Sequence, residues 1–367
     1  MYKPVLSLDV SKENSIAALY LSFGEPMGKP FRVEHTPSGF AALVEQLRNL
    51  ELLTHKKPEV ILESTGNYSR AITQNLMEAG YSVIALNPLE THEQKRRAIR
   101  KVKTDKVDAQ RIAKLYYFDE HRPLHPVNPE IAELRNLCRL YDGLSNLYIE
   151  AQLRFQSILD LLFPHYTNVF SDLCGDSSLN LISVFPTPEA VLSACKEDIV
   201  KHLKSKCQRK DWPEQIYQKL LAAARACLPY KVAQQSNVRV LREYIPILMT
   251  QKRLLSGLRA QIVAAAKGIP AYSLLKTIPG VGEITAASIL AEIGNITLFP
   301  TAKQLVAFAG LDPSVCQSGR FKADKNKLSK RGSGYLRKAL YQAASAGVRV
   351  TGKGPVILCC MITIPAK

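Results

Sequence analysis

Hydrophobic and polar residues in the first quarter of the chain follow two spacings, one typical of strands and one typical of helices. Short apolar runs rich in β-branched residues predict five strands, the first three in an antiparallel meander: residues 4–10, 15–23, 28–36, 58–63 and 82–86. Apolar residues at three- and four-residue steps predict a helix that Ser38 caps and that runs to Leu50. A second helix is expected from Tyr68 to Ala79, where Gly80 ends it. Strands that alternate with helices after a meander favour an α/β layer fold of the ribonuclease-H type.

The remainder of the chain has mostly the spacing of helices. Basic helical segments are expected at about 89–117, and the Pro-containing segment 121–129 is predicted to be a linker. Apolar positions between about 130 and 162 predict one long amphipathic helix with a face suited to coiled-coil pairing. Trp212 is expected at a helix N-terminus. The predicted domains are an α/β domain (1–120), a linker with the coiled-coil helix (121–165), a helical middle region of unassigned role (166–250) and a helical C-terminal domain (251–367).

Four acidic residues stand in surroundings that suggest chemistry. Asp9 and Glu63 each end a short apolar run of strand character, and Asp105 and Asp108 lie three apart in a helical segment, which places both on one helix face. Four converging carboxylates would repel one another unless a cation neutralised them, and oxygen-only ligation suits Mg²⁺ or Mn²⁺. Paired divalent ions in such a site clamp the attacking and leaving oxygens of a phosphodiester. The alternative interpretation is a set of turn residues, helix caps and solvated acids.

The charge of the chain favours the site over that alternative. The sequence carries 49 Lys and Arg against 32 Asp and Glu, a formal net charge of +17 that indicates a polyanionic partner. Asp105 and Asp108 lie within a basic stretch that attracts phosphate and whose candidate nucleic-acid contacts are Lys103, Lys106 and Arg111. The longest apolar runs fall short of the ~20 residues that span a bilayer, and the N-terminus does not have the pattern of a secretory signal. The eight cysteines lack CxxC spacing and predict reduced thiols in a cytoplasmic protein.

Residues 275–294 carry a second pattern, LKTIPGVGEITAASILAEIG. Gly280 and Gly282 permit a tight turn between two helices, and backbone N–H groups at the start of the second helix can hold a phosphate of a nucleic-acid backbone. The pattern is that of a helix-hairpin-helix, and a generic helical turn is the alternative.

A third pattern is a basic loop that follows Ser318. On composition alone this serine in a Gln-Ser-Gly turn is more typical of a turn former than of a nucleophile, because a free hydroxyl reacts poorly without activation. The basic residues proposed to contact nucleic acid are Arg320, Lys322, Lys325, Lys327, Lys330 and Arg331.

Six segments in order along the chain resemble the DEDD insertion-sequence transposase family: SLDVSK, ESTGNY, KTDKVDAQRIA, IPGVGEITAASILAEIG, FAGLDPSVCQSG and LSKRGSGYLRKALYQAA. The resemblance implies a RuvC-like N-terminal domain, whose metal-binding tetrad is Asp9, Glu63, Asp105 and Asp108, and a C-terminal transposase domain. It implies that Ser318 is a nucleophile that holds DNA through a phosphoserine link. It further implies a composite site between the two domains and a homo-oligomer, a dimer or tetramer, assembled through the coiled coil. Donor and target DNA and a structured non-coding guide RNA are the implied partners, in the bacterial cytoplasm near the nucleoid.

Two departures from the family pattern leave other functions open. The region 165–250 is longer than the core pattern requires, and the chain ends in GKGPVILCCMITIPAK, where a basic helical segment is usual. An inactive truncated relative that only binds nucleic acid would need just the basic surfaces and the hairpin. A RuvC-like junction nuclease that uses water and metal would need the tetrad and no serine.

Overall fold

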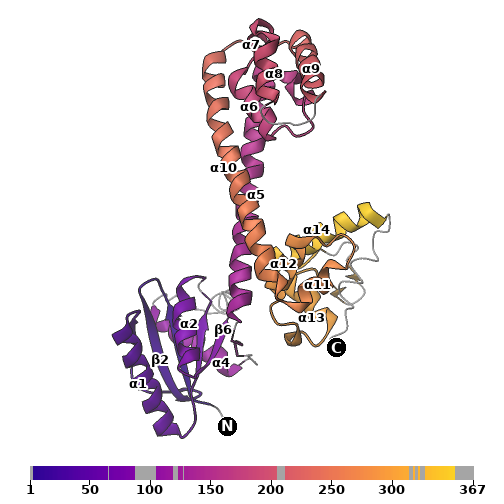
Figure 1. Cartoon of the computed structure of the whole chain (residues 1–367). Coiled ribbons are helices and arrows are strands. Elements are labelled where there is room, and N and C mark those ends of the chain that lie inside the picture. Colours follow the sequence, from indigo (N-terminus) through magenta and orange to yellow (C-terminus); the bar gives the residue numbers. More distant parts are fainter. Residues whose placement is uncertain are drawn as a thin grey trace. The chain divides into compact units, whose positions relative to one another are not determined.

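The computed structural model describes residues 3–64, 66–86, 105–118, 123–126, 128–204, 211–313, 317–318, 321–322 and 327–351. The chain divides into two compact units, residues 1–126 and residues 127–367. In Figure 1 the first unit is coloured indigo to purple and the second magenta to yellow. Among the described residues, no helix is both long enough and apolar enough to cross a membrane.

The first unit is built on one mixed sheet. Its strands, in spatial order, are β3 (Glu25–Pro26), β2 (Asn14–Ser22), β1 (Val5–Val10), β5 (Glu59–Glu63) and β6 (Ser82–Leu86), with β4 (Phe31–Glu34) also paired to β2. β1 and β4 run antiparallel to β2, which confirms the predicted meander, whereas β1, β5 and β6 are mutually parallel. The third predicted strand is shorter than expected and is preceded by the separate strand β3, which the apolar pattern did not indicate.

Helices cover both faces of this sheet, which confirms the predicted α/β layers (Figure 1). On one face, leucines of β1 pack against buried residues of α1 (Pro37–Thr54) and α2 (Tyr68–Glu78). On the other face, Val5 and Ile61 pack against α4 (Asp105–Phe118). Successive side chains along these strands thus point alternately into two cores, as expected for a sheet that is buried on both sides.

The start of α1 corrects one prediction. The cap is Thr36 and not Ser38, because the Thr36 side chain accepts a hydrogen bond from the backbone N–H of Gly39 at 3.1 Å. Pro37 then occupies the first helical position, where its missing N–H costs nothing. The helix also continues past Leu50 to Thr54, through a last turn whose leucines are exposed and therefore gave no apolar signal.

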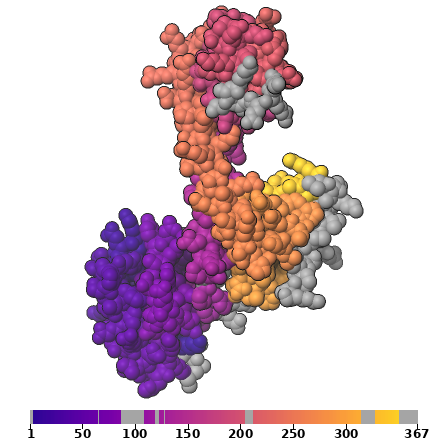
Figure 2. Space-filling view, viewed as in Figure 1, coloured from indigo at the N-terminus to yellow at the C-terminus, as the bar shows by residue number. Residues whose placement is uncertain are grey.

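The second unit is organised around two long helices of 34 residues each, α5 (Pro129–Leu162) and α10 (Gln234–Lys267). They run antiparallel, since the first half of α5 shares a core with the last half of α10, and the reverse holds at the other end. The predicted long helix is therefore confirmed, and part of its pairing face is covered by α10 of the same chain. Between the two cores the pair forms a narrow column in Figure 2, with Leu147, Ile149 and Leu254 about half exposed.

Shorter helices gather at each end of the α5–α10 pair (Figure 1). One end, termed here the helical cap, contains η1 (Pro164–Asn168), α6 (Asp176–Val184), α7 (Pro188–Ser193), α8 (Lys196–Lys204) and α9 (Trp212–Ala226). The other end contains α11 (Pro270–Lys276), α12 (Glu283–Ile293), η2 (Ile296–Leu298), α13 (Ala302–Phe308), β7 (Gln317–Ser318), β8 (Phe321–Lys322) and α14 (Gly334–Thr351). The mainly helical region and the position of Trp212 at the start of α9 are both as predicted.

Candidate active site

The structure brings Asp9 and Glu63 to the same end and the same face of the sheet. β1 and β5 are parallel neighbours with Ser7 opposite Ile61 and Leu8 opposite Leu62, so the next step of the register sets Asp9 beside Glu63. Val5 and Ile61 point into the core beneath α4. Asp9 is four residues after Val5 and Glu63 is two residues after Ile61, so both point to the same face as these residues. The two carboxylates that the sequence singled out thus share one edge of one sheet face.

Helix α4 covers this face and points its N-terminus toward the same edge. Near the C-terminal end of α4, the hydroxyl of Tyr116 donates to Glu59 Oε2 at 2.8 Å and that of Tyr117 donates to the Lys3 carbonyl at 3.0 Å. Lys3 and Glu59 lie at the beginnings of β1 and β5, so α4 runs antiparallel to these strands. The first turns of α4, which carry Asp105 and Asp108, are therefore directed toward the ends of the strands where Asp9 and Glu63 stand.

Asp108 is turned inward and is already engaged. It is 6% exposed, and Arg111 donates to its Oδ1 at 2.9 Å in an ion pair along the helix. The side chains of Asp105 and Lys106, and all of Lys103, lie outside the described residues. Within the part of the chain that the structure describes, no three metal-binding side chains lie close enough together to hold an ion. The convergence of all four carboxylates stays a prediction.

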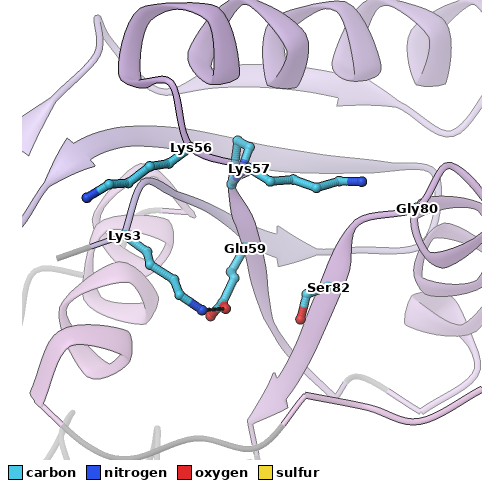
Figure 3. Close-up of a pocket in the computed structure, with 7 residues that line it drawn as sticks. Lys3, Lys56, Lys57, Glu59, Gly80 and Ser82 are labelled. Atoms are coloured by element: carbon cyan, nitrogen blue, oxygen red, sulfur yellow. Dashed lines mark hydrogen bonds and ion pairs between the residues drawn. The ribbon is translucent and has the colours of Figure 1, made fainter. Parts of the chain in front are cut away.

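A cavity of about 380 Å³ lies at the opposite end of the sheet (Figure 3). Among the described residues its lining consists of Lys3, Lys56, Lys57, Pro58, Glu59, Gly80 and Ser82, and includes none of the candidate carboxylates. Glu59 is paired with Lys3 there, while Lys56 and Lys57 point away from one another in Figure 3. The cavity is therefore separate from the candidate active site, and its positive side chains do not converge on one point.

The two glycines of the 275–294 pattern have different surroundings. Gly280 has a φ of +87°, and a Cβ there would stand 2.3 Å from the carbonyl oxygen of Ala343 and from the backbone nitrogen of Gly347. Only glycine allows the turn to close on α14 in this way. Gly282 is exposed and is the N-cap of α12, with nothing within 4 Å of its Cβ position. Two helices, α11 and α12, therefore flank this turn, while the helix-hairpin-helix assignment and phosphate binding by its backbone stay predictions.

Ser318 lies in the second unit, in a hairpin of two short strands. It is the last residue of β7 and pairs with Phe321 of β8, so only Gly319 and Arg320 connect the strands. The side chains of Ser318 and Lys322, and the whole of Arg320 and Lys325, lie outside the described residues. Lys327, Lys330 and Arg331 follow the hairpin and are exposed.

One buried acid was not singled out from the sequence. Glu292 of α12 is 4% exposed, and Arg139 of α5 donates to both of its carboxylate oxygens, at 2.7 and 3.0 Å. Burial by itself raises the pKa of Glu292, but hydrogen bonds from Arg139 and Ser333 outweigh it, so this pKa lies below its usual range. The signal was available, since Glu292 is an acid within the apolar run ILAEIG.

Comparison with known proteins finds the same kind of protein at both ends of the chain. One family model, described as a transposase of the DEDD IS110 type, matches residues 6–164, and a second, described as the transposase IS116/IS110/IS902 family, matches residues 272–355. The first match contains Asp9, Glu63, Asp105 and Asp108, and the second contains Ser318 and α14. Together the matches cover more than half of the chain.

Individual relatives agree with the family models. The chain is 26% identical over 254 residues to a protein of insertion element IS110 from Streptomyces coelicolor, a match of 66% of this chain and 60% of that protein. It is 35% identical over 111 residues to the transposase for insertion sequence element IS1111A of Coxiella burnetii, covering 30% of each chain. A pilin gene-inverting protein of Moraxella bovis is 40% identical over 72 residues, or 20% of this chain and 22% of that one. These matches span less than two thirds of the relatives' own lengths.

An α/β unit followed in sequence by a helical unit is the arrangement over which the two transposase family models match. By these matches the chain belongs to the IS110 group of insertion-sequence transposases.

Proposed function

We propose that this protein is the recombinase of an insertion sequence, an enzyme that cuts and rejoins DNA strands in a metal-dependent reaction. The observation that carries the proposal is the position of Asp9 and Glu63, side by side at one end of β1 and β5, on the face toward which the first turns of α4 are directed. The relatives are named as transposases and as a gene-inverting protein, and these names describe DNA rearrangement, which supports the same reaction class.

The donor chemistry of this edge fits a hard divalent cation. Asp9 and Glu63 would hold Mg²⁺ or Mn²⁺ together with Asp105 and Asp108, because carboxylate oxygens are the ligands these ions prefer. When bound, such ions neutralise charge on the phosphate and on the attacking and leaving oxygens. Asp108 would have to leave Arg111 for this role, and Arg111 would then be available to a DNA phosphate. We also propose that the α/β unit is a RuvC-like domain.

Ser318 is the proposed nucleophile. Its hydroxyl oxygen attacks a phosphorus of the DNA backbone, so a P–Oγ ester forms as one P–O bond of the strand breaks. The serine proton passes to a nearby base, and the departing sugar oxygen takes up a proton. A hydroxyl from a second DNA end then attacks the phosphoserine, which restores the strand and the serine. Lys327, Lys330 and Arg331, which follow the hairpin in sequence and are exposed, could stabilise the phosphate charge.

The proposed partners are donor and target DNA, a structured non-coding guide RNA, and further copies of this chain in a dimer or tetramer. The net charge of +17 supports polyanionic partners. The half-exposed apolar side chains midway along the α5–α10 pair support self-association, because a coiled-coil face of that kind is normally covered.

Metal removal tests the reaction class. Full-length protein, with DNA carrying the ends of its element and the RNA transcribed from its flanks, is expected to cut strands with Mg²⁺ or Mn²⁺ and to lose this activity in EDTA. Binding measured by gel shift should change little in EDTA, because basic side chains supply the affinity. Strand cutting at an undiminished rate in EDTA would refute the metal-dependent mechanism.

Binding to DNA is expected to weaken steeply with salt. Each neutralised phosphate contributes roughly −0.9 to the slope of log affinity against log salt, so replacing Lys325, Lys327, Lys330 and Arg331 by glutamine should flatten that slope by up to about 3.6. Fluorescence anisotropy between low and moderate salt measures this. A control with the same charge change at the end of the second unit that carries the helical cap, replacing Lys201 of α8, Lys219 of α9, Arg239 of α10 and Lys231, should leave the slope nearly unchanged. Equal flattening in both variants would exclude a specific role for the loop.

A further inference from the structure

A buried polar network joins α5, α12 and the start of α14. Glu292 accepts two hydrogen bonds from the Arg139 guanidinium, and the Ser333 hydroxyl donates to Glu292 Oε2 at 2.8 Å. Arg139 also lies over the ring of Tyr335, 4.7 Å from its centroid. Arg135, one turn earlier on α5, donates to the carbonyl of Ala291 at 2.7 Å. The carboxylate of Glu292 is thus fixed between α5 on one side and α14 on the other.

This network is unsuited to binding a ligand. The cavity beside it measures about 30 Å³, which is room for one or two water molecules. A buried acid with bidentate Arg contacts is costly to desolvate, and in some proteins such a pair serves to fix the arrangement of the elements it joins.

Ser333 connects the network to the segment that carries Ser318. The Ser333 hydroxyl also accepts a hydrogen bond from the backbone N–H of Leu336 at 3.2 Å, and this bond caps α14. The backbone N–H of Ser333 donates to the carbonyl of Phe308 at 2.7 Å. Phe308 ends α13 and precedes the serine hairpin, whereas Ser333 follows it. One residue therefore ties the buried acid, the start of α14 and the entry of the serine segment together.

The two ends of that segment are held side by side at several further points. Lys330 N–H donates to Gly310 at 3.1 Å, Ser329 N–H donates to Asp312 at 2.9 Å, and Pro313 and Leu328 form an isolated bridge. The residues that make these contacts are termed here the loop base: Phe308, Gly310, Asp312, Pro313, Leu328, Ser329, Lys330 and Ser333.

The loop base is packed too closely for larger residues. A Cβ on Gly332 would stand 1.9 Å from the carbonyl oxygen of Phe308, and a Cβ on Gly310 would stand 2.8 Å from the backbone nitrogen of Gly332. Arg337, one turn into α14, donates to the carbonyl of Ala309 at 3.1 Å. These contacts give a common structural role to Gly332, Ser333 and Arg337 of the motif KRGSGYLR.

We infer that Glu292, Arg139 and Ser333 are positioning residues, which hold the loop base against α5 and α12 and so fix where the Ser318 hairpin starts and ends. The inference rests on the proposed role of Ser318. Displacement of a nucleophile by about 1 Å can cost a reaction on the order of 100-fold in rate. The network would affect the reaction rate through the position of the Ser318 hairpin, which it sets by holding the loop base, and it would not contact DNA itself.

Three variants of the full-length protein test the inference. Ser333→Ala removes the hydroxyl, Ser333→Thr restores one, and Glu292→Gln keeps the shape of the acid but removes the charge that pairs with Arg139. Lys338→Met is the matched control, because Lys338 lies on α14 and contacts Asp142 and Asn146 of α5 but is not part of the loop base. The rate of Ser318–DNA adduct formation at saturating DNA, the affinity for DNA and amide hydrogen exchange at residues 308–312 and 329–333 are measured for each.

Ser333→Ala and Glu292→Gln are expected to slow adduct formation by roughly 10- to 100-fold with affinity unchanged, and to speed exchange at the loop base. Ser333→Thr and Lys338→Met should resemble the wild type in all three measurements. A wild-type adduct rate in folded Ser333→Ala and Glu292→Gln would overturn the inference. If wild-type protein forms no adduct at Ser318, the proposed nucleophile fails, and exchange alone then decides whether the network holds the loop base. Unchanged exchange in both variants would refute that too.

Discussion

Replacing Glu63 by glutamine is expected to abolish strand cutting while leaving the binding of DNA intact. The change keeps the size of the side chain and removes one of the two charges that stand together at the ends of β1 and β5. Glu63 would hold the cation that stabilises the reacting phosphate, and loss of stabilisation of that kind costs on the order of 10²–10³-fold in rate. Asp9→Asn should behave in the same way, and affinity for DNA should stay equal or rise, because a negative charge near the phosphate is removed.

Glu59→Gln is the matched control for this prediction. Glu59 lies on the same strand and the same face as Glu63, four residues earlier, where it pairs with Lys3 and Tyr116. It therefore tests the loss of an acid from β5 without touching the candidate active site. Cleavage of a labelled DNA substrate measures both variants. If Glu59→Gln and Glu63→Gln slow the reaction equally, the effect comes from the stability of the sheet and not from the site.

Replacing Ser318 by alanine is expected to eliminate the covalent protein–DNA species. The proposed intermediate is an ester of the serine oxygen, which alanine cannot form, whereas the carboxylates and the basic loop are unchanged. A denaturing gel of protein incubated with its RNA, DNA and Mg²⁺ separates the adduct from free protein. Recombination measured on plasmids in the same mixture should fall to background.

Ser314→Ala is the control for Ser318→Ala, since Ser314 is the same residue type four positions earlier in the same segment. It should form the adduct at the wild-type rate. An adduct of undiminished yield in Ser318→Ala would exclude the serine mechanism and favour a nuclease that activates water at its metal ions. An adduct lost in both variants would indicate disturbance of the segment and not the removal of one hydroxyl.

The local features of this fold were predictable because their causes are local. The strands around Asp9 and Glu63 and the long helix α5 follow from apolar spacing within a few residues, and their bounds agree with the structure within one or two positions. The cap of α1 was assigned to Ser38 instead of Thr36 because two hydroxyl residues stand two apart, and spacing alone does not separate them.

The contacts that sequence spacing missed join residues far apart in the chain. Nothing near Gly280 indicates that its Cα lies against the backbone of Ala343 and Gly347, and nothing near Glu292 identifies Arg139 as its partner. The adjacency of Asp9 and Glu63 could be predicted only in part. Each strand follows from its local sequence, but the pairing of the two strands depends on the order of strands in the sheet.

Because side chains along β1 alternate between the two faces of the sheet, the position of Asp9 depends on the exact number of residues in this strand. Leu6 and Leu8 are fully buried on the α1–α2 side, and Asp9 follows them on the other side. Deleting a single residue between Val5 and Leu8 would shift the register by one, turn Asp9 into the apolar core beneath α1 and α2 and put Val10 in its place, so the candidate site would lose its acid and both cores would be disturbed. Insertions and deletions can therefore be absorbed in connecting segments, while β1 can vary only by substitution.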